Sequence, residues 1–464
     1  MTYILQVNSP VDNSIYAERL YASAADISDA MSNAVRAQQQ WQASNLKYRK
    51  AICLRAVEAM LEKQLVLGEE ISWQMGRPIR YTPGEINGFA ERARAMIEIA
   101  EQKLAGITLP EKAGFTRYIE RAPLGVVFSI VPWNYPYLTA VNSIIPAIMA
   151  GNAVIMKPSS QTPLTAERIG EALDSAGLPK GIFQHLLLNY DSAAKIIQSD
   201  QVNYIAFTGS VSGGHMVEQA AAGRFVDVGL ELGGKDPAYV RSDVDLEFAI
   251  DNLVDGVYFN SGQSCCGIER IYVHKDIYND FVDGFINKVK EYRLGNPLEQ
   301  DTTLGPMVSN NAAENVRRHI KDAIARGAKA CIDANEFSAD QQRGPYLAPQ
   351  VLLKVDHSMQ VMTEETFGPV AGIMQVTSDE EAIELVNDSK YGLTASVWTQ
   401  DQDAAINIGN QINTGTWFMN RCDYLDPELA WTGVKDSGKG CTLSEVGYEK
   451  LTRPKSFHLR TSTR

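Results

Sequence analysis

Residues 125–157 read GVVFSIVPWNYPYLTAVNSIIPAIMAGNAVIMK, and this stretch decides the fold. The β-branched run at Val126–Val131 predicts a buried strand, and Leu138–Ala150 has the apolar spacing of a helix that Gly151 ends. A second apolar run, Ala153–Met156, predicts another strand. A strand, a helix and a strand in this order indicate a parallel βαβ unit. Several prolines and asparagines interrupt the stretch, so it does not predict a membrane span.

The same alternation of strands and helices continues along the chain. A helix is predicted at Leu164–Ala176, and further strands are predicted at Ile182–Leu187, Tyr204–Phe207 and Phe225–Leu230. After Gly233 a second α/β segment runs to about Asn420, with strands predicted at Ile271–His274, Val351–Val355, Gly372–Val376, Ala395–Thr399 and Thr416–Met419. The first hundred residues have the apolar spacing of amphipathic helices that cover a sheet. The sequence therefore predicts an α/β protein with a nucleotide-binding type of parallel sheet and a second domain.

The composition excludes several classes of protein. The 464 residues carry a net charge of −13 with scattered cationic side chains, which argues against a nucleic-acid partner. The six cysteines form no CxxC or Cys/His spacing, so we expect free thiols in a reducing compartment and no metal site. Residues 1–13 have neither a basic start nor a long apolar stretch, so we expect a cytoplasmic protein with no membrane partner.

Residues 106–121, which precede the first predicted strand, show a different pattern. Phe115, Arg117, Ile119 and Arg121 alternate along the chain after a turn at Gly114. This period of two predicts a β-hairpin that projects away from the core.

The sharpest chemical feature is a pair of thiols after a small polar turn. Residues 259–266 read FNSGQSCC, which places Cys265 and Cys266 side by side. Upstream, residues 230–235 read LELGGK, where Glu231 ends an apolar strand and precedes two glycines. Because α/β folds bind ligands at the carboxyl ends of their strands, Glu231 is a candidate site residue. A free cysteine usually only packs in the core, and this interpretation stays open for Cys266.

Three other segments follow predicted strands of the first sheet. They are PWNYP at residues 132–136, MKPS at residues 156–159 and FTGSVSGG at residues 207–214. Glycines at a turn from strand to helix let a pyrophosphate approach the backbone, and the amino end of the helix favours the anion. The third segment is therefore a candidate phosphate site, and the lysine of the second segment adds a cation at the same edge.

Together these motifs resemble those of the NAD(P)-dependent aldehyde dehydrogenase superfamily. The family marks are PWN, K-P-S/A-x-x-T-P, F-T-G-S-x-x-x-G, L-E-L-G-G-K, F-N-x-G-Q-x-C, E-E-x-F-G-P and G-x-K-x-S-G-x-G. All occur here in order, at Pro132–Asn134, Lys157–Pro163, Phe207–Gly214, Leu230–Lys235, Phe259–Cys265, Glu364–Pro369 and Gly433–Gly440. In length the chain is similar to the succinate-semialdehyde dehydrogenase-like members. The resemblance implies oxidation of a small-molecule aldehyde to the carboxylic acid, with NAD or NADP as cofactor.

The resemblance implies three catalytic residues. Cys265 is the implied nucleophile, which forms first a thiohemiacetal and then a thioester with the aldehyde. The side-chain amide of Asn134 and the backbone N–H of Cys265 are the implied donors to the tetrahedral oxyanion. Glu231 is the implied general base that activates water for hydrolysis of the thioester. Where the family commonly has G-x-G-R-E, residues 438–442 read GKGCT, so Thr442 stands in place of that glutamate.

The resemblance also implies the cofactor-binding residues. Lys157 is expected at the adenosine ribose, Glu365 at the nicotinamide ribose and Phe367 packed on that ribose. The residues expected around the pyrophosphate are Trp133, Gly209, Ser210 and Gly214. Members that require NAD often carry Glu three residues after the lysine, and this chain has Ser160 there. Since the negative charge that would repel a 2′-phosphate is missing, we expect NADP to be tolerated.

The implied lining of the aldehyde tunnel includes Tyr135, Trp431 and Arg421. Aromatic walls favour apolar or aromatic aldehydes. Arg421 admits two interpretations, a partner for the carboxylate of succinate semialdehyde or a structural ion pair with Asp423 or Asp426. The alternative functions are a dedicated succinate-semialdehyde dehydrogenase and a CoA-acylating semialdehyde dehydrogenase. Glu231 argues against the latter, because acylating members typically lack the carboxylate base.

The resemblance divides the chain into three parts. Residues 1–105 and 122–232 are the implied NAD(P)-binding domain with a Rossmann-like sheet, and residues 233–440 are the implied catalytic domain. Residues 106–121 and 441–464 are the implied oligomerisation element of a homodimer or homotetramer.

Overall fold

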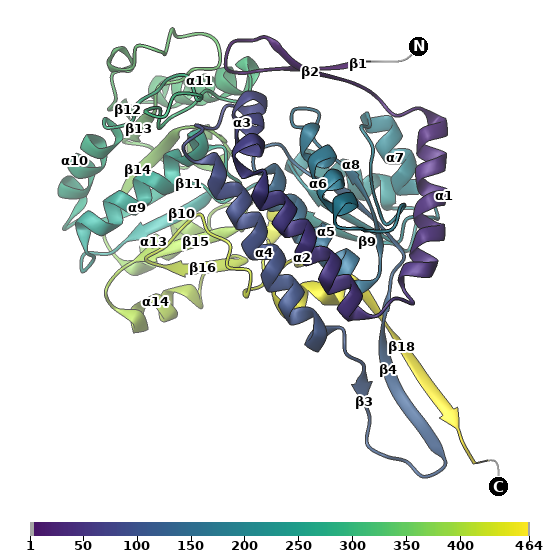
Figure 1. Cartoon of the computed structure of the whole chain (residues 1–464). Helices are drawn as coiled ribbons and strands as arrows, with labels where there is room; N and C mark the ends of the chain where they lie inside the picture. Colours follow the sequence, from purple (N-terminus) through teal and green to yellow (C-terminus); the bar gives the residue numbers. More distant parts are fainter. Residues whose placement is uncertain (1–3, 463–464) are drawn as a thin grey trace.

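Two mainly parallel sheets, both flanked by helices, make up most of the computed structural model, which describes residues 4–462 (Figure 1). The predicted α/β class and the predicted alternation are confirmed. The first sheet has the order β17-β9-β8-β5-β6-β7. Its strands are β5 (Val126–Ile130), β6 (Ala153–Lys157), β7 (Phe183–His185), β8 (Tyr204–Thr208), β9 (Asp227–Glu231) and β17 (Gly438–Lys439). All pair in parallel except β17, which runs antiparallel to β9.

Helices cover both faces of this sheet because successive side chains of its strands point to opposite sides. Val127 and Val154 pack with α2, α4, α5 and α6, whereas Phe128 and Ile155 pack with α1, α7 and α8. The helices of this half are α1 (Ala24–Trp41), α2 (Leu46–Glu62), α3 (Gln64–Met75), α4 (Thr82–Lys103), α5 (Pro136–Ala150), α6 (Leu164–Ser175), α7 (Tyr190–Gln198) and α8 (Val211–Ala221).

The second sheet has the order β12-β13-β14-β11-β10-β15-β16. Its strands are β10 (Asp236–Val240), β11 (Ile268–His274), β12 (Lys329–Ala330), β13 (Gln350–Leu353), β14 (Val370–Val376), β15 (Thr394–Trp398) and β16 (Thr416–Met419). Only the short β12 runs antiparallel to its neighbour. The helices are α9 (Leu246–Tyr258), α10 (Tyr278–Val289), α11 (Asn310–Ala325), α12 (Gln360–Thr363), α13 (Asp379–Asn387) and α14 (Gln402–Gly409).

A three-stranded ribbon extends away from these layers (Figure 1). It joins β3 (Ile107–Thr108), β4 (Phe115–Pro123) and β18 (Thr452–Arg460), in the order β18-β4-β3. The predicted hairpin is therefore present, and β18 adds a third strand to it by pairing with β4 along nine residues. A second ribbon near the amino end pairs β1 (Ile4–Asn8) with β2 (Ile15–Leu20), and α15 (Ser444–Gly447) precedes β18.

The pattern did not predict β1, β2, β10, β12, β17 or β18, and two of these strands, β10 and β17, bear on how the two sheets are built. The strand β10 contains Pro237, which argues against a strand in a sheet interior because proline donates no ladder hydrogen bond. A register shift between Asp236 and Pro237 accommodates this proline. The strand β17 falls in the range predicted for the catalytic domain, yet it lies at the edge of the first sheet. Within residues 4–462, no helix combines the length and the apolarity needed to cross a membrane.

Candidate active site

A cavity of about 460 Å³ brings Glu231 and Cys265 together. One wall is a face of α4 and the turn before it, with residues 81, 84, 85, 88 and 92 spaced by three or four positions. Another wall comes from the first two turns of α5, with Leu138, Thr139 and Asn142. Of the side chains expected at the aldehyde, Tyr135 and Trp431 also line this cavity.

The carboxyl group of Glu231 lies at the end of β9, where two hydroxyl groups hold it. The Thr208 hydroxyl donates to Oε2 at 3.0 Å, and the Thr442 hydroxyl donates to Oε1. Burial raises the pKa of Glu231 above its ordinary value, and the two hydrogen bonds oppose this shift. Thr442, which stands where the resembled family commonly has a glutamate, thus holds one oxygen of the Glu231 carboxyl group.

The two neighbouring thiols have different surroundings. The Cys266 Sγ is buried and donates to Asp423 Oδ1 at 3.0 Å, while the Ser264 hydroxyl donates to the same oxygen at 2.7 Å. The neighbouring Cys265 thiol and burial hold the pKa of Cys266 well above its ordinary value. Cys266 is therefore held as a protonated donor, while Cys265 lines the cavity partly exposed.

The loop before Cys265 is fixed by its own polar residues. Asn260, Ser261 and Gly262 have left-handed backbone with φ of 52°, 56° and 69°. Such residues cost about 1–3 kcal/mol when they are not glycine, and surrounding contacts must hold them. Ser261 Oγ donates to the Gly305 carbonyl at 2.8 Å, and Gln263 Oε1 accepts from the Val308 N–H at 2.8 Å. The FNSGQ stretch therefore positions the thiol of Cys265 against the cavity.

Gly234 lies against this loop, and its replacement by alanine should disturb the site. A Cβ at Gly234 would overlap the carbonyl oxygen of Cys265, which is backbone and cannot move aside cheaply. We expect Gly234→Ala to lower the free energy of unfolding by about 1–3 kcal/mol, as overpacking does. We also expect a lower kcat, because the nucleophile is displaced. Urea unfolding and steady-state kinetics measure the two effects.

Gly223 provides the matched control for that substitution. A Cβ at Gly223 meets no atom within 4 Å, so Gly223→Ala should change the free energy of unfolding by no more than about 0.5 kcal/mol. Equal effects of the two substitutions would contradict the close approach of Gly234 to Cys265.

Asn134 lies beside the nucleophile loop, although it is not among the cavity-lining residues. Its Nδ2 donates to the Gln263 carbonyl at 3.1 Å. The backbone carbonyl of Asn134 accepts from Arg77 Nη2 and, at 3.4 Å, from Asn260 Nδ2. The amide is thus buried within reach of the Cys265 loop, and one N–H of Nδ2 is left over for an oxyanion.

Arg421 lies outside the cavity lining. Its side chain is exposed, and its guanidinium stacks on the ring of Tyr424 at 3.6 Å from the ring centroid. Within residues 4–462 it forms no ion pair with Asp423 or Asp426. The structure therefore brings Arg421 neither to a substrate carboxylate nor to either aspartate.

The residues expected around the adenosine and the phosphates lie at the carboxyl ends of β6 and β8. Ser210 caps α8 and accepts from the Gly213 N–H at 3.1 Å, so this helix start presents backbone donors. Lys157 ends β6, and its Nζ donates only to the Pro158 carbonyl, at 3.3 Å, within the described residues. Burial lowers the pKa of Lys157, and Ser160 nearby is exposed. A cation without an acidic partner and a helix amino end at the same edge of the sheet fit a dinucleotide.

Glu365 and Phe367, the residues expected at the nicotinamide ribose, lie in the loop between α12 and β14, and Phe367 contacts Trp133, which is expected at the pyrophosphate. Trp133 and Phe367 contact edge to face, with ring centroids 5.7 Å apart. Glu365 Oε1 accepts from the Gly234 N–H at 3.0 Å, and burial raises the pKa of Glu365 to about 8. A neutral carboxyl in this position can donate to one hydroxyl of a ribose as well as accept from another, so it fits the nicotinamide ribose.

Several supporting residues have no clear signal in the sequence. Lys235 forms a buried ion pair with Glu269, whose carboxylate accepts from the backbone N–H groups of Thr366 and Phe367 at 2.8 and 2.9 Å. This arrangement positions the loop that carries Glu365. Lys235 belongs to the LELGGK motif, but only the fold brings Glu269 to it.

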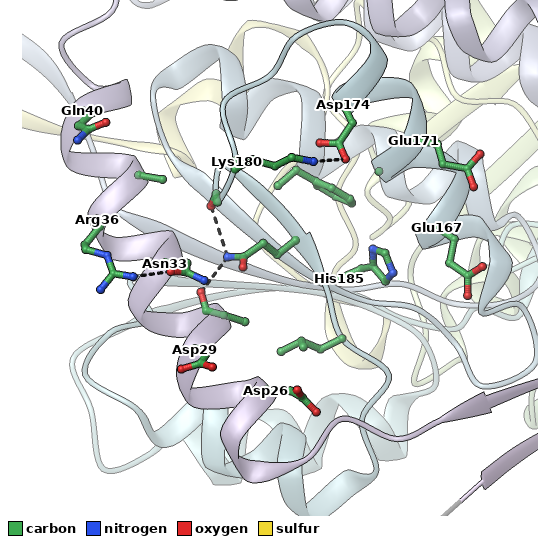
Figure 2. A pocket seen from close by; sticks show the side chains of 17 residues that line it. Asp26, Asp29, Asn33, Arg36, Gln40, Glu167, Glu171, Asp174, Lys180 and His185 are labelled. Carbon is green, nitrogen blue, oxygen red and sulfur yellow. Dashed lines mark hydrogen bonds and ion pairs between the residues drawn. The ribbon is translucent and has the colours of Figure 1, made fainter.

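A larger hollow of about 970 Å³ lies elsewhere, beside α1, α6 and the edge strand β7 (Figure 2). None of its lining residues is a predicted site residue. Lys180 forms an ion pair with Asp174 at 2.6 Å, Glu171 is paired with Lys63 and Arg168, and Asp26 and Asp29 also line the hollow. This hollow is an acidic surface feature and not a part of the site that contains Cys265.

Comparison with known proteins gives one consistent result. Residues 2–457 match the profile of the Aldehyde dehydrogenase family. The betaine aldehyde dehydrogenase of Rhizobium leguminosarum bv. trifolii is 32% identical over 451 residues, which cover 97% of this chain and 92% of that protein.

Two solved structures superpose on nearly the whole chain. The NAD-dependent aldehyde dehydrogenase from Sinorhizobium meliloti matches with a TM-score of 0.95 at 30% identity, covering 100% of this chain and 92% of that one. The NADP-dependent glyceraldehyde-3-phosphate dehydrogenase from Bacillus halodurans C-125, complexed with NADP, matches with a TM-score of 0.93 at 31% identity. That match covers 99% of this chain and 96% of the other.

Proposed function

The chain belongs to the aldehyde dehydrogenase family and is an NAD(P)-dependent oxidoreductase, and we propose that it converts aldehydes to carboxylic acids through a thioester on Cys265. The observation that carries this proposal is that Cys265 and Glu231 line one cavity, with a partly exposed thiol and a carboxyl group held by two hydroxyls. A nucleophile and a base that share a cavity are what acyl transfer to water requires.

The first half of the reaction uses Cys265 and Asn134. The Cys265 thiolate attacks the aldehyde carbonyl, and the carbonyl oxygen becomes an oxyanion. The Asn134 amide and the Cys265 backbone N–H donate to this oxyanion, a kind of stabilisation worth about 10²–10³ in kcat for each donor. A nicotinamide held at Glu365 and Phe367 would accept the hydride that leaves the former aldehyde carbon. The product on the protein is an acyl thioester of Cys265.

The second half uses Glu231. Its carboxylate takes a proton from a water molecule in the cavity, and this water attacks the thioester carbonyl. The C–S bond breaks, the carboxylic acid leaves and Cys265 regains its thiol. Burial, which raises the pKa of Glu231, makes its carboxylate a stronger base than an exposed one.

We further propose that both NAD and NADP are accepted, because Ser160 brings no negative charge near Lys157. Ser160→Glu should therefore lower kcat/KM for NADP at least about tenfold while it leaves or raises kcat/KM for NAD. Ser160→Gln is the matched control, because glutamine has the size of glutamate without its charge. This substitution should change kcat/KM for NADP less than Ser160→Glu does. Initial rates with each cofactor at a fixed aldehyde concentration measure the ratio. An unchanged NADP value with Ser160→Glu would contradict this role.

The predicted division of the chain stays a proposal, which the sheet order supports except at β17 (Gly438–Lys439), a strand of the first sheet. We propose that residues 1–105 and 122–232 bind the cofactor, that residues 233–440 carry the nucleophile, and that residues 106–121 and 441–464 contact a second copy of the chain in a homodimer or homotetramer. The long pairing of β18 with β4 in a projecting ribbon supports the last assignment. A cytoplasmic location stays a prediction from the sequence.

The test of the proposed function is cofactor reduction with a panel of aldehydes, followed by absorbance, with and without CoA. Reduction with a neutral aldehyde in the absence of CoA, with the free acid as product, is the expected result. Acyl-CoA as the product, or reduction that depends on CoA, would instead assign the acylating reaction. No reduction with any aldehyde would contradict the proposal.

A further inference from the structure

Arg92 is a buried cation in the cavity and has no acidic partner. Its side chain lies on α4, and the residue is only 8% exposed. Its Nη1 donates to the Leu138 carbonyl at 2.8 Å and to Asn142 Oδ1 at 3.4 Å. Within residues 4–462, its Nε and Nη2 donate to no protein atom, and no carboxylate lies within ion-pair distance. Three of the five N–H groups of this guanidinium are therefore left unused.

Arg77, which lines the same cavity, shows how a buried guanidinium is normally satisfied. Its Nε donates to Asn260 Oδ1 at 3.0 Å, its Nη1 forms an ion pair with Glu85, and its Nη2 donates to the Asn134 carbonyl. All three of its nitrogens have partners. The contrast shows that the open donors of Arg92 are particular to that residue and not a general property of the cavity.

The hydrogen-bond partners of Arg92 are all neutral, and Glu231, Glu85 and Asp423 act on its charge only through space, without an ion pair. Removing an ion from water costs several kcal/mol unless a counter-ion and hydrogen bonds compensate, and burial lowers the pKa of Arg92 accordingly. Asn142, which is 3% exposed and also lines the cavity, leaves its Nδ2 without a partner. Two adjacent buried groups thus hold unused donors at one place. An acceptor with a negative charge would satisfy both.

The acidic residues of the cavity do not supply this acceptor. Glu85 is paired with Arg77, and Glu231 accepts from Thr208 and Thr442. Asp423 Oδ1 already accepts from Ser264 and Cys266. Glu91 and Asp255 are exposed and so lie at the solvent end of the cavity. Arg92 is thus the unpaired charge in the buried part.

We propose that Arg92 and Asn142 bind a carboxylate of the substrate, and that the protein oxidises aldehydes that carry a carboxylate at the end opposite the aldehyde. This inference rests on the proposed aldehyde oxidation. The planar fork of a guanidinium matches a carboxylate with two parallel hydrogen bonds. The substrate class therefore differs from the cationic aldehyde in the name of the betaine aldehyde dehydrogenase relative.

Three aldehydes of matched length test the charge preference. They are 4-oxobutanoate, butanal and 4-(trimethylammonio)butanal, which are anionic, neutral and cationic. Arg92→Met, of similar length and no charge, should lower kcat/KM for 4-oxobutanoate by about 10–100-fold and for butanal by less than about threefold, because a hydrogen bond to a charged group contributes about 1.5–3 kcal/mol. Arg92→Lys should recover part of the loss.

A second variant keeps the inference testable if Arg92→Met does not fold. Asn142→Asp preserves the shape of the side chain and places a carboxylate against Arg92, so it should reduce kcat/KM for 4-oxobutanoate and spare butanal. Arg421→Met is the matched control outside the cavity and should leave the ratio of 4-oxobutanoate to butanal unchanged. Succinate should slow the alkylation of Cys265 by iodoacetamide in the wild-type protein, and Arg92→Met should remove this protection.

The outcomes separate the inference from the proposed function. If butanal is oxidised but Arg92→Met lowers kcat/KM equally for all three aldehydes, Arg92 acts on Glu231 or on folding. The proposed carboxylate subsite is then wrong. A wild-type preference for the cationic aldehyde would overturn it as well. If no aldehyde reduces the cofactor, the proposed function itself fails, whereas protection of Cys265 by succinate still reports on the subsite.

Discussion

We expect Cys265→Ala to lower kcat/KM for aldehyde oxidation by at least about 10⁴-fold, because no other group can form the thioester. The substitution removes one small side chain that is partly exposed to the cavity, so the fold and cofactor binding should remain. Reduced-cofactor formation measures the loss. Thermal unfolding and quenching of tryptophan fluorescence by added NADP show whether the protein is folded and still binds.

Cys266→Ser is the matched control for that substitution. Serine keeps a hydroxyl that can donate to Asp423 Oδ1, as the Cys266 thiol does at 3.0 Å. We expect kcat/KM to stay within about tenfold of the wild-type value, since this hydrogen bond is worth about 0.5–1.5 kcal/mol. If Cys266→Ser abolished turnover and Cys265→Ala retained it, the two thiols would have exchanged roles.

The second large effect concerns Glu231. Glu231→Gln should give one rapid burst of reduced cofactor per active site, after which turnover falls by about 10²–10⁴-fold because water is no longer activated. Glutamine keeps the shape and an oxygen that accepts from Thr208 or Thr442. Stopped-flow absorbance measures the burst, and the intact mass after acid quenching shows the acyl group on Cys265. Steady turnover without a burst would contradict the role of Glu231 as the base.

The pKa of Glu231 also sets a pH dependence. Burial raises this pKa above its ordinary value of 4.5, and only the carboxylate form accepts a proton from water. Turnover should therefore fall as the pH drops through the raised pKa. Removal of the Thr442 hydroxyl takes away a hydrogen bond that opposes the shift, so Thr442→Val should move this acidic limb to higher pH. An unmoved limb would show that another group sets it.

The strands of both sheets were largely predictable from the sequence, because each is a short β-branched run bounded by glycine or proline. Thr416–Met419 matches its prediction residue for residue, and most other boundaries differ by one to three positions. The pattern failed at β10, because Pro237 argues against a strand in the interior of a sheet. It also failed at β17, because a two-residue strand has no period to recognise.

The site was predictable only where residues belong to a motif. Glu231 and Cys265 come from two such motifs, and they share a cavity. Arg77, Arg92 and Asn142 lie on helices or in a turn whose spacing indicates only a buried face. Their partners are far away in the chain, and which donors stay unused depends on how α4 packs on α5. That information exists in the tertiary structure and not in any local pattern.

The pairing of β17 with β9 has a consequence for synthesis of the protein. Thr442 and Glu231 are 211 positions apart, and the ribosome makes Glu231 first. A nascent chain can assemble the five parallel strands of the first sheet while β9 is still an open edge and its carboxyl group lacks one hydroxyl partner. We therefore expect the surroundings of Glu231 to be completed late in translation, only after residue 442 has been made.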